Sequence, residues 1–154
     1  MAEAKAKTIV TMKLEATCPT HSRTDVVARD TETTIDEPTV RGGTNLGPSP
    51  TETLMAALMG CTNTITHKIA AANGIEIKEM SLRVETVFDR RGVTLQEEVD
   101  VPFPETRLFI NLTTDAEDAK IDRLKADLAK FCPVSKVIRG AGTKLTEVWN
   151  ISCP

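Results

Sequence analysis

The chain has 154 residues, a hydrophobic fraction of 40% and a net charge of −3 at pH 7. These values predict one domain, spanning 1–154, with an ordinary core. The weak negative charge gives no electrostatic reason to expect nucleic acid or an anionic membrane as a partner. No apolar run has the length of a transmembrane helix, and the N-terminal residues lack the apolar core of a signal peptide. We therefore expect a cytoplasmic protein, in which four cysteines are fillers or reactive thiols and not a static disulfide framework.

The first third of the chain predicts short strands and then a long loop. Alternating apolar residues indicate a strand over 7–16, and two short strands over 23–28 and 32–35 would form a hairpin. The loop over 37–49 is rich in glycine and proline, and a loop of that length in a compact domain is usually functional or forms an interface. We divide the domain into N-terminal strands (1–36), this loop, a central helix (50–74) and a C-terminal part (75–154).

The central helix is the longest predicted element and is apolar nearly all round. Ser49 can cap it, Pro50 suits its first position, and Glu52 falls in the first turn, where the helix dipole favours a carboxylate. Its apolar stripe runs through Leu54, Leu58, Cys61, Ile65 and Ile69. We therefore expect this helix to be covered on several sides, by more protein than one small subunit supplies.

The C-terminal part predicts strands and helices in turn. Strands are expected over 79–90, around 108–112 and over 144–151, with a weaker strand or loop over 93–101. An amphipathic helix over 116–131, capped by Thr114 or Asp115, is followed by a short helix that starts at Cys132 or Pro133 and is stopped by Gly140 and Gly142. Strands linked as hairpins around one long helix indicate an α+β fold and not a doubly wound sheet.

Two cysteines stand in a context that suggests chemistry. Cys61 follows Gly60 in the middle of the central helix; the alternative is a small core filler, because free cysteine is among the most buried residue types. Cys132 precedes Pro133 at a helix N-terminus, where backbone N–H groups lower the pKa of a thiol; the alternative is that it merely caps the helix. The two remaining cysteines, Cys18 and Cys153, are predicted to be incidental.

Metal binding is the competing use of cysteine and histidine. The chain has no C-x-x-C pair, and neither His21 nor His67 stands at a ligand spacing from a cysteine. His67 also points to a different part of the helix from Cys61, so a Cys–His hydrolytic dyad is not expected. We expect neither a metal nor a cofactor.

Two motifs together resemble the OsmC/Ohr family of thiol-dependent peroxidases. The first comprises Asp36-Glu37-Pro38, Gly42-Gly43-Thr44-Asn45, Gly47 to Glu52, Leu54, Ala56-Ala57-Leu58 and Cys61, and the second is Cys132-Pro133-Val134-Ser135. The resemblance covers nearly the whole chain. It implies an OsmC-like α+β fold, in which antiparallel sheets wrap around the long central helix in an intertwined homodimer.

The same resemblance implies the site and the reaction. Cys61 would be the peroxidatic cysteine, Cys132 the resolving one and Glu52 the active-site acid. The family's arginine lies upstream of the loop, where Arg23 is the best match, followed by Arg29 and, within the loop, Arg41. The thiolate would reduce an organic hydroperoxide, with hydrogen peroxide as an additional candidate, in defence against oxidative stress. Glu52 would hold the arginine, which would lower the pKa of Cys61, and an external dithiol would reduce the resulting disulfide.

A second function remains open from the residues alone. A non-catalytic OsmC-like dimer could bind a small apolar ligand, with its thiols as fillers or redox sensors. The two functions differ in whether an arginine and Glu52 converge on the sulfur of Cys61.

Overall fold

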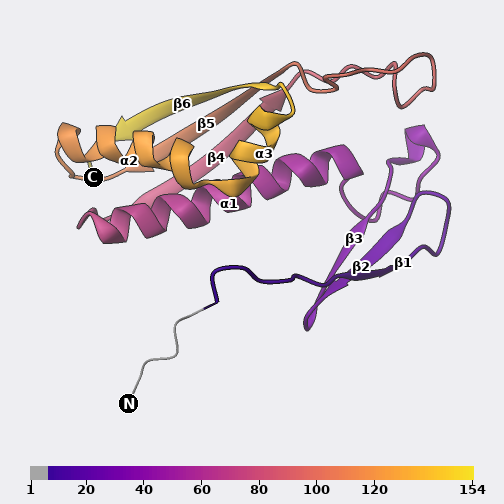
Figure 1. Ribbon diagram of the computed structural model, residues 1–154, viewed down its shortest axis with the longest axis horizontal. Coiled ribbons are helices and arrows are strands. Elements are labelled where there is room, and N and C mark those ends of the chain that lie inside the picture. Colours follow the sequence, from indigo (N-terminus) through magenta and orange to yellow (C-terminus); the bar gives the residue numbers. More distant parts are fainter. Residues whose placement is uncertain (1–6) are drawn as a thin grey trace. The chain divides into compact units, whose positions relative to one another are not determined.

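The structure is a computed structural model that describes residues 7–154 (Figure 1). Over these residues the chain forms three α-helices, one 3-10 helix and two three-stranded sheets, which is the expected α+β class. The chain comprises two compact units. The N-terminal unit ends at Leu54, and the C-terminal unit runs from Met55 to Pro154.

Three short antiparallel strands form the sheet of the N-terminal unit, in the order β1–β2–β3. They are β1 (Glu15–Thr17), β2 (Thr24–Ala28) and β3 (Thr31–Ile35). The predicted hairpin is confirmed: β2 pairs with β3 along its whole length, and Arg29 turns the chain between them with a φ of 59°. A 3-10 helix, η1 (Thr39–Arg41), interrupts the long loop that follows.

The strand predicted over 7–16 is mostly wrong. Glu15 pairs with Val27, one residue before the end of β2, so the residues that precede Glu15 run past the end of their neighbour. A strand needs a hydrogen-bonded partner, and alternation of apolar residues does not supply one. Ile9 and Met12 are consequently more than four-fifths exposed within this chain.

The helix α1 (Pro50–Ala72) begins where the sequence predicts, because a capping box fixes its first turn. The N–H of Ser49 donates to Oε2 of Glu52 at 2.7 Å, and the N–H of Glu52 donates to Oγ of Ser49 at 3.3 Å. The helix ends just before Gly74, whose φ of 63° suits a residue without a Cβ atom.

The buried face of α1 differs from the predicted apolar stripe. Leu58 and Ile69 are buried as expected, but Cys61 and Ile65 are only half-buried and Leu54 is exposed. The buried face is therefore rotated from the prediction, and two threonines occupy part of it.

Thr62 and Thr66 are both almost fully buried. The hydroxyl of Thr62 donates to the carbonyl oxygen of Leu58 at 2.8 Å, so its polar group is satisfied inside the helix. In the described part of the chain the hydroxyl of Thr66 has no partner. A helical threonine can bond its own helix, which is how Thr62 is accommodated in the core.

The C-terminal unit pairs β4 (Glu79–Thr86) with β5 (Glu105–Thr113) antiparallel, and β5 with β6 (Lys144–Ser152) parallel. The parallel pairing differs from the expected antiparallel sheets. It requires a crossover, which α2 (Asp118–Phe131) and α3 (Pro133–Gly140) supply. The three helices lie along one face of this sheet (Figure 1).

The core of the C-terminal unit lies between these helices and β5. Alternate residues of β5 point inward, because every second position is buried and the positions between them are half-buried or exposed. The fully buried members of the core are Leu58, Leu108, Ile110, Leu112, Leu124, Leu128 and Cys132. One of the two candidate thiols is therefore a core residue by position.

The start of α2 differs from the predicted cap. Glu117 occupies the N-cap and makes no side-chain cap, so neither Thr114 nor Asp115 caps the helix. The hydroxyl of Thr114 instead donates to the carbonyl oxygen of Glu76 at 2.7 Å and accepts from the N–H of Ala116. It ties the end of β5 to the segment that precedes β4.

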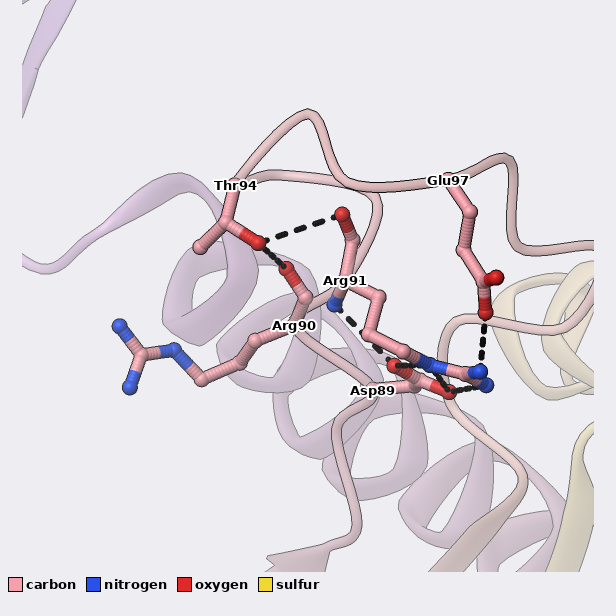
Figure 2. A network of polar contacts seen from close by, with 5 residues as sticks. All are labelled: Asp89, Arg90, Arg91, Thr94 and Glu97. Carbon is pink, nitrogen blue, oxygen red and sulfur yellow. Dashed lines mark hydrogen bonds and ion pairs between the residues drawn. The ribbon is translucent and has the colours of Figure 1, made fainter.

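The connection between β4 and β5 is a long ordered loop. β4 ends before the polar turn at 89–92, and the segment 93–101, expected as a weaker strand or loop, is a loop. The guanidinium of Arg91 pairs with Asp89 and with Glu97 across this loop (Figure 2). No helix among residues 7–154 combines the length and apolarity that crossing a membrane demands.

Candidate functional site: a thiol pair at the start of α3

The structure brings Cys61 and Cys132 together across 71 residues of sequence. Sγ of Cys132 lies 3.3 Å from Sγ of Cys61, and both are free thiols. Cys132 is fully buried, whereas Cys61 is half-buried. A disulfide bond is about 2.05 Å long, so a shift of little more than 1 Å would join them.

A break between two helices sets the position of Cys132. Its backbone is extended, with φ −73° and ψ 107°, because the residue before a proline avoids the helical region. Its N–H still donates to Leu128 in α2, while its carbonyl oxygen accepts from the N–H of Lys136 in α3 and from the hydroxyl of Ser135. Cys132 is thus the end of one helix and the N-cap of the next, which confirms the predicted helix start.

The electrostatics favour the neutral form of Cys61. Burial is the main cause that raises the pKa of Cys61, and the neighbouring thiol of Cys132 raises it further. The N–H of Val134 opposes this shift by donating to the sulfur of Cys61. The raised pKa is opposite to the lowering that an adjacent arginine was expected to cause.

The N–H of Val134 is the site group that sequence reasoning missed. The N-terminus of α3 was predicted to serve the thiolate of Cys132, but this N–H donates to Cys61. Pro133 has no N–H, so Val134 carries the first donor that the helix can offer. The Cys-Pro pair could have signalled this, but only once Cys61 was known to lie opposite it.

Glu52 and the candidate arginines lie in the N-terminal unit, with partners of their own. The carboxylate of Glu52 belongs to the capping box with Ser49, whose hydrogen bonds lower the pKa of Glu52. Arg23 pairs with Asp25 through two contacts of 2.9 Å. Arg23 and Glu52 are therefore engaged within their own unit, and their roles toward Cys61 stay predictions.

The two other candidate arginines are also placed. Arg41 pairs with Glu37 at 2.6 Å within the loop, and Arg29 lies in the turn between β2 and β3. Cys18 and Cys153 are exposed free thiols. Residues 7–154 hold no group of three or more His, Cys, Asp or Glu side chains arranged to bind a metal ion.

Comparison with known proteins identifies the family. A family model described as OsmC-like protein matches residues 43–148. The chain belongs to the OsmC-like family. This confirms the resemblance drawn from the two cysteine motifs, and both cysteines lie inside the matched segment of the OsmC-like chain. No curated protein matches it.

Solved structures with this fold come from several bacteria. An OsmC-like protein from Mycoplasma pneumoniae is 17% identical, with a TM-score of 0.74 over 94% of this chain and 97% of that one. An organic hydroperoxide resistance protein from Elizabethkingia anophelis is 18% identical, with a TM-score of 0.68 over 96% and 100%. The organic hydroperoxide resistance protein OhrB of Bacillus subtilis is 21% identical, with a TM-score of 0.59 over 92% and 98%. At these identities they show the fold that the OsmC-like chain shares.

Proposed function

We propose that this OsmC-like chain is a cytoplasmic thiol peroxidase that reduces organic hydroperoxides in defence against oxidative stress. The observation that carries the proposal is the 3.3 Å separation of Cys61 and Cys132. A half-exposed thiol beside a buried one suits a two-cysteine cycle, because the first can meet the peroxide and the second can resolve the product. The names of the E. anophelis and B. subtilis proteins support the choice of an organic hydroperoxide.

The cycle balances with one peroxide and one dithiol. The Cys61 thiolate attacks a peroxide oxygen, the O–O bond breaks, and the alcohol leaves with a proton as Cys61 becomes a sulfenic acid. The sulfur of Cys132 then attacks the sulfur of Cys61, the S–O bond breaks, and water leaves. An external dithiol reduces the resulting disulfide by exchange and is itself oxidised to a disulfide.

In the single chain, burial raises the pKa of Cys61. Formation of the thiolate therefore needs a nearby cation that lowers this pKa. We assign this role to Arg23, with Glu52 as the carboxylate that orients it. In this assignment Arg23 exchanges its contact with Asp25 for one with Glu52. The resemblance to the OsmC/Ohr family supports the assignment.

A homodimer is part of the proposal. Of residues 7–54, only Asp36 and Ser49 are buried, so the N-terminal unit has no hydrophobic core of its own. A three-stranded sheet needs a covered apolar face to be stable. On α1, Ala56 and Gly60 are exposed in the single chain, which leaves room for a second copy to approach closely.

Intact-mass spectrometry with thiol counting would test the cycle. One equivalent of an organic hydroperoxide should remove two thiols from the wild-type protein, and peptide mapping should place the disulfide at Cys61–Cys132. The Cys132→Ser variant should accumulate sulfenic or overoxidised Cys61, and Cys61→Ser should keep its remaining thiols. Cys18→Ser serves as a matched control, because it removes an exposed thiol and should behave as wild type. A wild-type protein that consumes no peroxide and keeps four thiols would refute the peroxidase.

The raised pKa of Cys61 favours a second candidate, a redox-sensing or ligand-binding dimer. A mostly protonated thiol reacts slowly, so such a protein would form the same disulfide without efficient turnover. Steady-state consumption of hydroperoxide in the presence of dithiothreitol separates the two functions. A peroxidase turns over many equivalents, whereas a sensor stops after one.

A further inference from the structure

Asp36 is a carboxylate that the chain buries completely. It lies directly after β3, and its two oxygens accept five hydrogen bonds. Oδ1 accepts from the hydroxyl of Ser22 at 2.9 Å and from the N–H of Glu37 at 2.8 Å. Oδ2 accepts from both the N–H and the hydroxyl of Thr44, and from the N–H of Leu46 at 3.2 Å. We name Asp36 and its four partners, Ser22, Glu37, Thr44 and Leu46, the Asp36 cage.

The Asp36 cage is built for a negative charge without a cation. None of the ion pairs among residues 7–154 includes Asp36, so neutral donors alone satisfy it. Those donors hold the pKa of Asp36 well below its usual range. An asparagine could not replace it, since its amide N–H groups would face other donors.

The cage joins the two segments that lead to Arg23 and Glu52. On one side it holds Ser22, the residue directly before Arg23. On the other side it holds the loop, and the N–H of Asp36 donates to Pro48, directly before the Ser49 that forms the capping box with Glu52. One buried carboxylate therefore anchors both flanks inside a single unit.

The backbone segments of this frame approach one another closely. A Cβ atom on Gly43 would lie 1.9 Å from the carbonyl oxygen of Glu37, and one on Gly47 would lie 2.0 Å from that of Thr34. No side chain fits at either position unless the backbone moves. Segments packed this closely can hold a side chain to the tolerance that a catalytic site requires.

We infer that Asp36 is a positioning residue, which fixes Arg23 and Glu52 relative to one another so that they serve the Cys61 thiolate as a pair. The inference rests on the proposed function, in which Arg23 and Glu52 act on Cys61. Asp36 itself touches neither the peroxide nor the sulfur. Its effect reaches the reaction through Ser22 and Arg23 on one side and through Ser49 and Glu52 on the other.

The experiment compares pH profiles of hydroperoxide consumption with thermal stability. Ser22→Ala removes one link of the cage next to Arg23, and Asp36→Asn disrupts the whole cage. Thr31→Ala is the matched control, because its hydroxyl makes one hydrogen bond, to Ala28, in the same sheet but outside the cage. Arg23→Ala shows what loss of the arginine does to the profile.

Ser22→Ala should have a melting temperature close to that of Thr31→Ala. Its pH profile of hydroperoxide consumption should nevertheless shift to higher pH, as that of Arg23→Ala does. Its rate at pH 7 should fall about threefold, since half a pKa unit changes the thiolate fraction by about that factor. Asp36→Asn should shift the profile further. In the Arg23→Ala background, Ser22→Ala should have no additional effect on the profile, which is the signature of one residue that acts through another.

Two results would overturn the inference, and they are distinguishable. If Arg23→Ala shifts the profile while Ser22→Ala and Asp36→Asn leave it as in wild type, the cage only stabilises the loop. If Arg23→Ala leaves the profile unchanged, the assignment of Arg23 in the proposed function fails, and the positioning role fails with it.

Discussion

Oxidation of Cys61 and Cys132 should make the protein more stable by an amount that the structure predicts. The bond would close a loop of 71 residues, and loop-closure entropy for that length is about 4 kcal/mol at 25 °C. The two sulfurs already lie 3.3 Å apart, so the fold need not distort to form the bond. For a chain of this size, 1 kcal/mol corresponds to about 2–4 °C in melting temperature, so oxidation should raise it by about 8–16 °C.

Differential scanning calorimetry of reduced and hydroperoxide-treated protein would measure this shift. Protein concentration has to be held constant, because a dimer melts at a temperature that depends on concentration. Cys132→Ser and Cys153→Ser are the informative pair: the first removes the partner of Cys61, and the second removes an exposed thiol near the C-terminus. The shift should vanish in the first variant and persist in the second.

Two outcomes would refute this reasoning. A wild-type protein that forms the Cys61–Cys132 disulfide but melts at a lower temperature would show that the bond strains the α2–α3 break. A shift of equal size in Cys132→Ser would show that peroxide stabilises the protein through some other group. The first outcome would show that the fold distorts to form the bond, and the second that the bond is not the source of the added stability.

Substitutions elsewhere separate the core, the loop and the exposed face of α1. Leu124→Ala removes a fully buried side chain and should lower the free energy of unfolding by about 2–5 kcal/mol, whereas exposed Val93→Ala should change it by less than about 0.5 kcal/mol. Equal losses of this free energy in the two variants, measured by urea unfolding, would contradict the place of Leu124 in the core. Gly43→Ala should lower the melting temperature, since its Cβ atom would lie 1.9 Å from a backbone carbonyl oxygen. A Cβ atom on Gly60 would meet nothing within 4 Å in its own chain, so the Gly60→Ala subunit should stay folded. In sedimentation the same variant should weaken the proposed dimer, and an unchanged dimer would place the second copy elsewhere. The low folded-state pKa of Asp36 stabilises the protein above about pH 4 and loses that contribution as the pH falls below it. Asp36→Asn should therefore flatten the loss of stability between about pH 4 and pH 2, and an unchanged acid slope would contradict this.

The sequence predicts elements best where local signals decide them. The start of α1 follows from Ser49, Pro50 and Glu52, which act within one turn, and the break at Cys132 follows from the proline after it. The strand over 7–16 fails for the complementary reason. Its alternation is real, but a strand forms only against a neighbour, and β2 ends too early to provide one.

The site is predicted less completely, because its properties depend on contacts between distant segments. The pairing of Cys61 with Cys132 came from the family resemblance, since no spacing rule joins residues 71 positions apart. The direction of the Cys61 pKa could not be read from the sequence either. Burial determines it, and burial depends on which face of α1 turns inward.

Different forces hold the thiol pair and the residues that are assigned to assist it. The thiol pair sits at the edge of a hydrophobic core, where Cys132 is buried with Leu124 and Leu128. The residues assigned to assist the thiolate sit in a unit without a hydrophobic core, where hydrogen bonds to Asp36 fix the loop. Cavities in the core should therefore destabilise the fold and displace the thiols together. Changes in the Asp36 cage should instead alter the reactivity of Cys61 while the disulfide still forms.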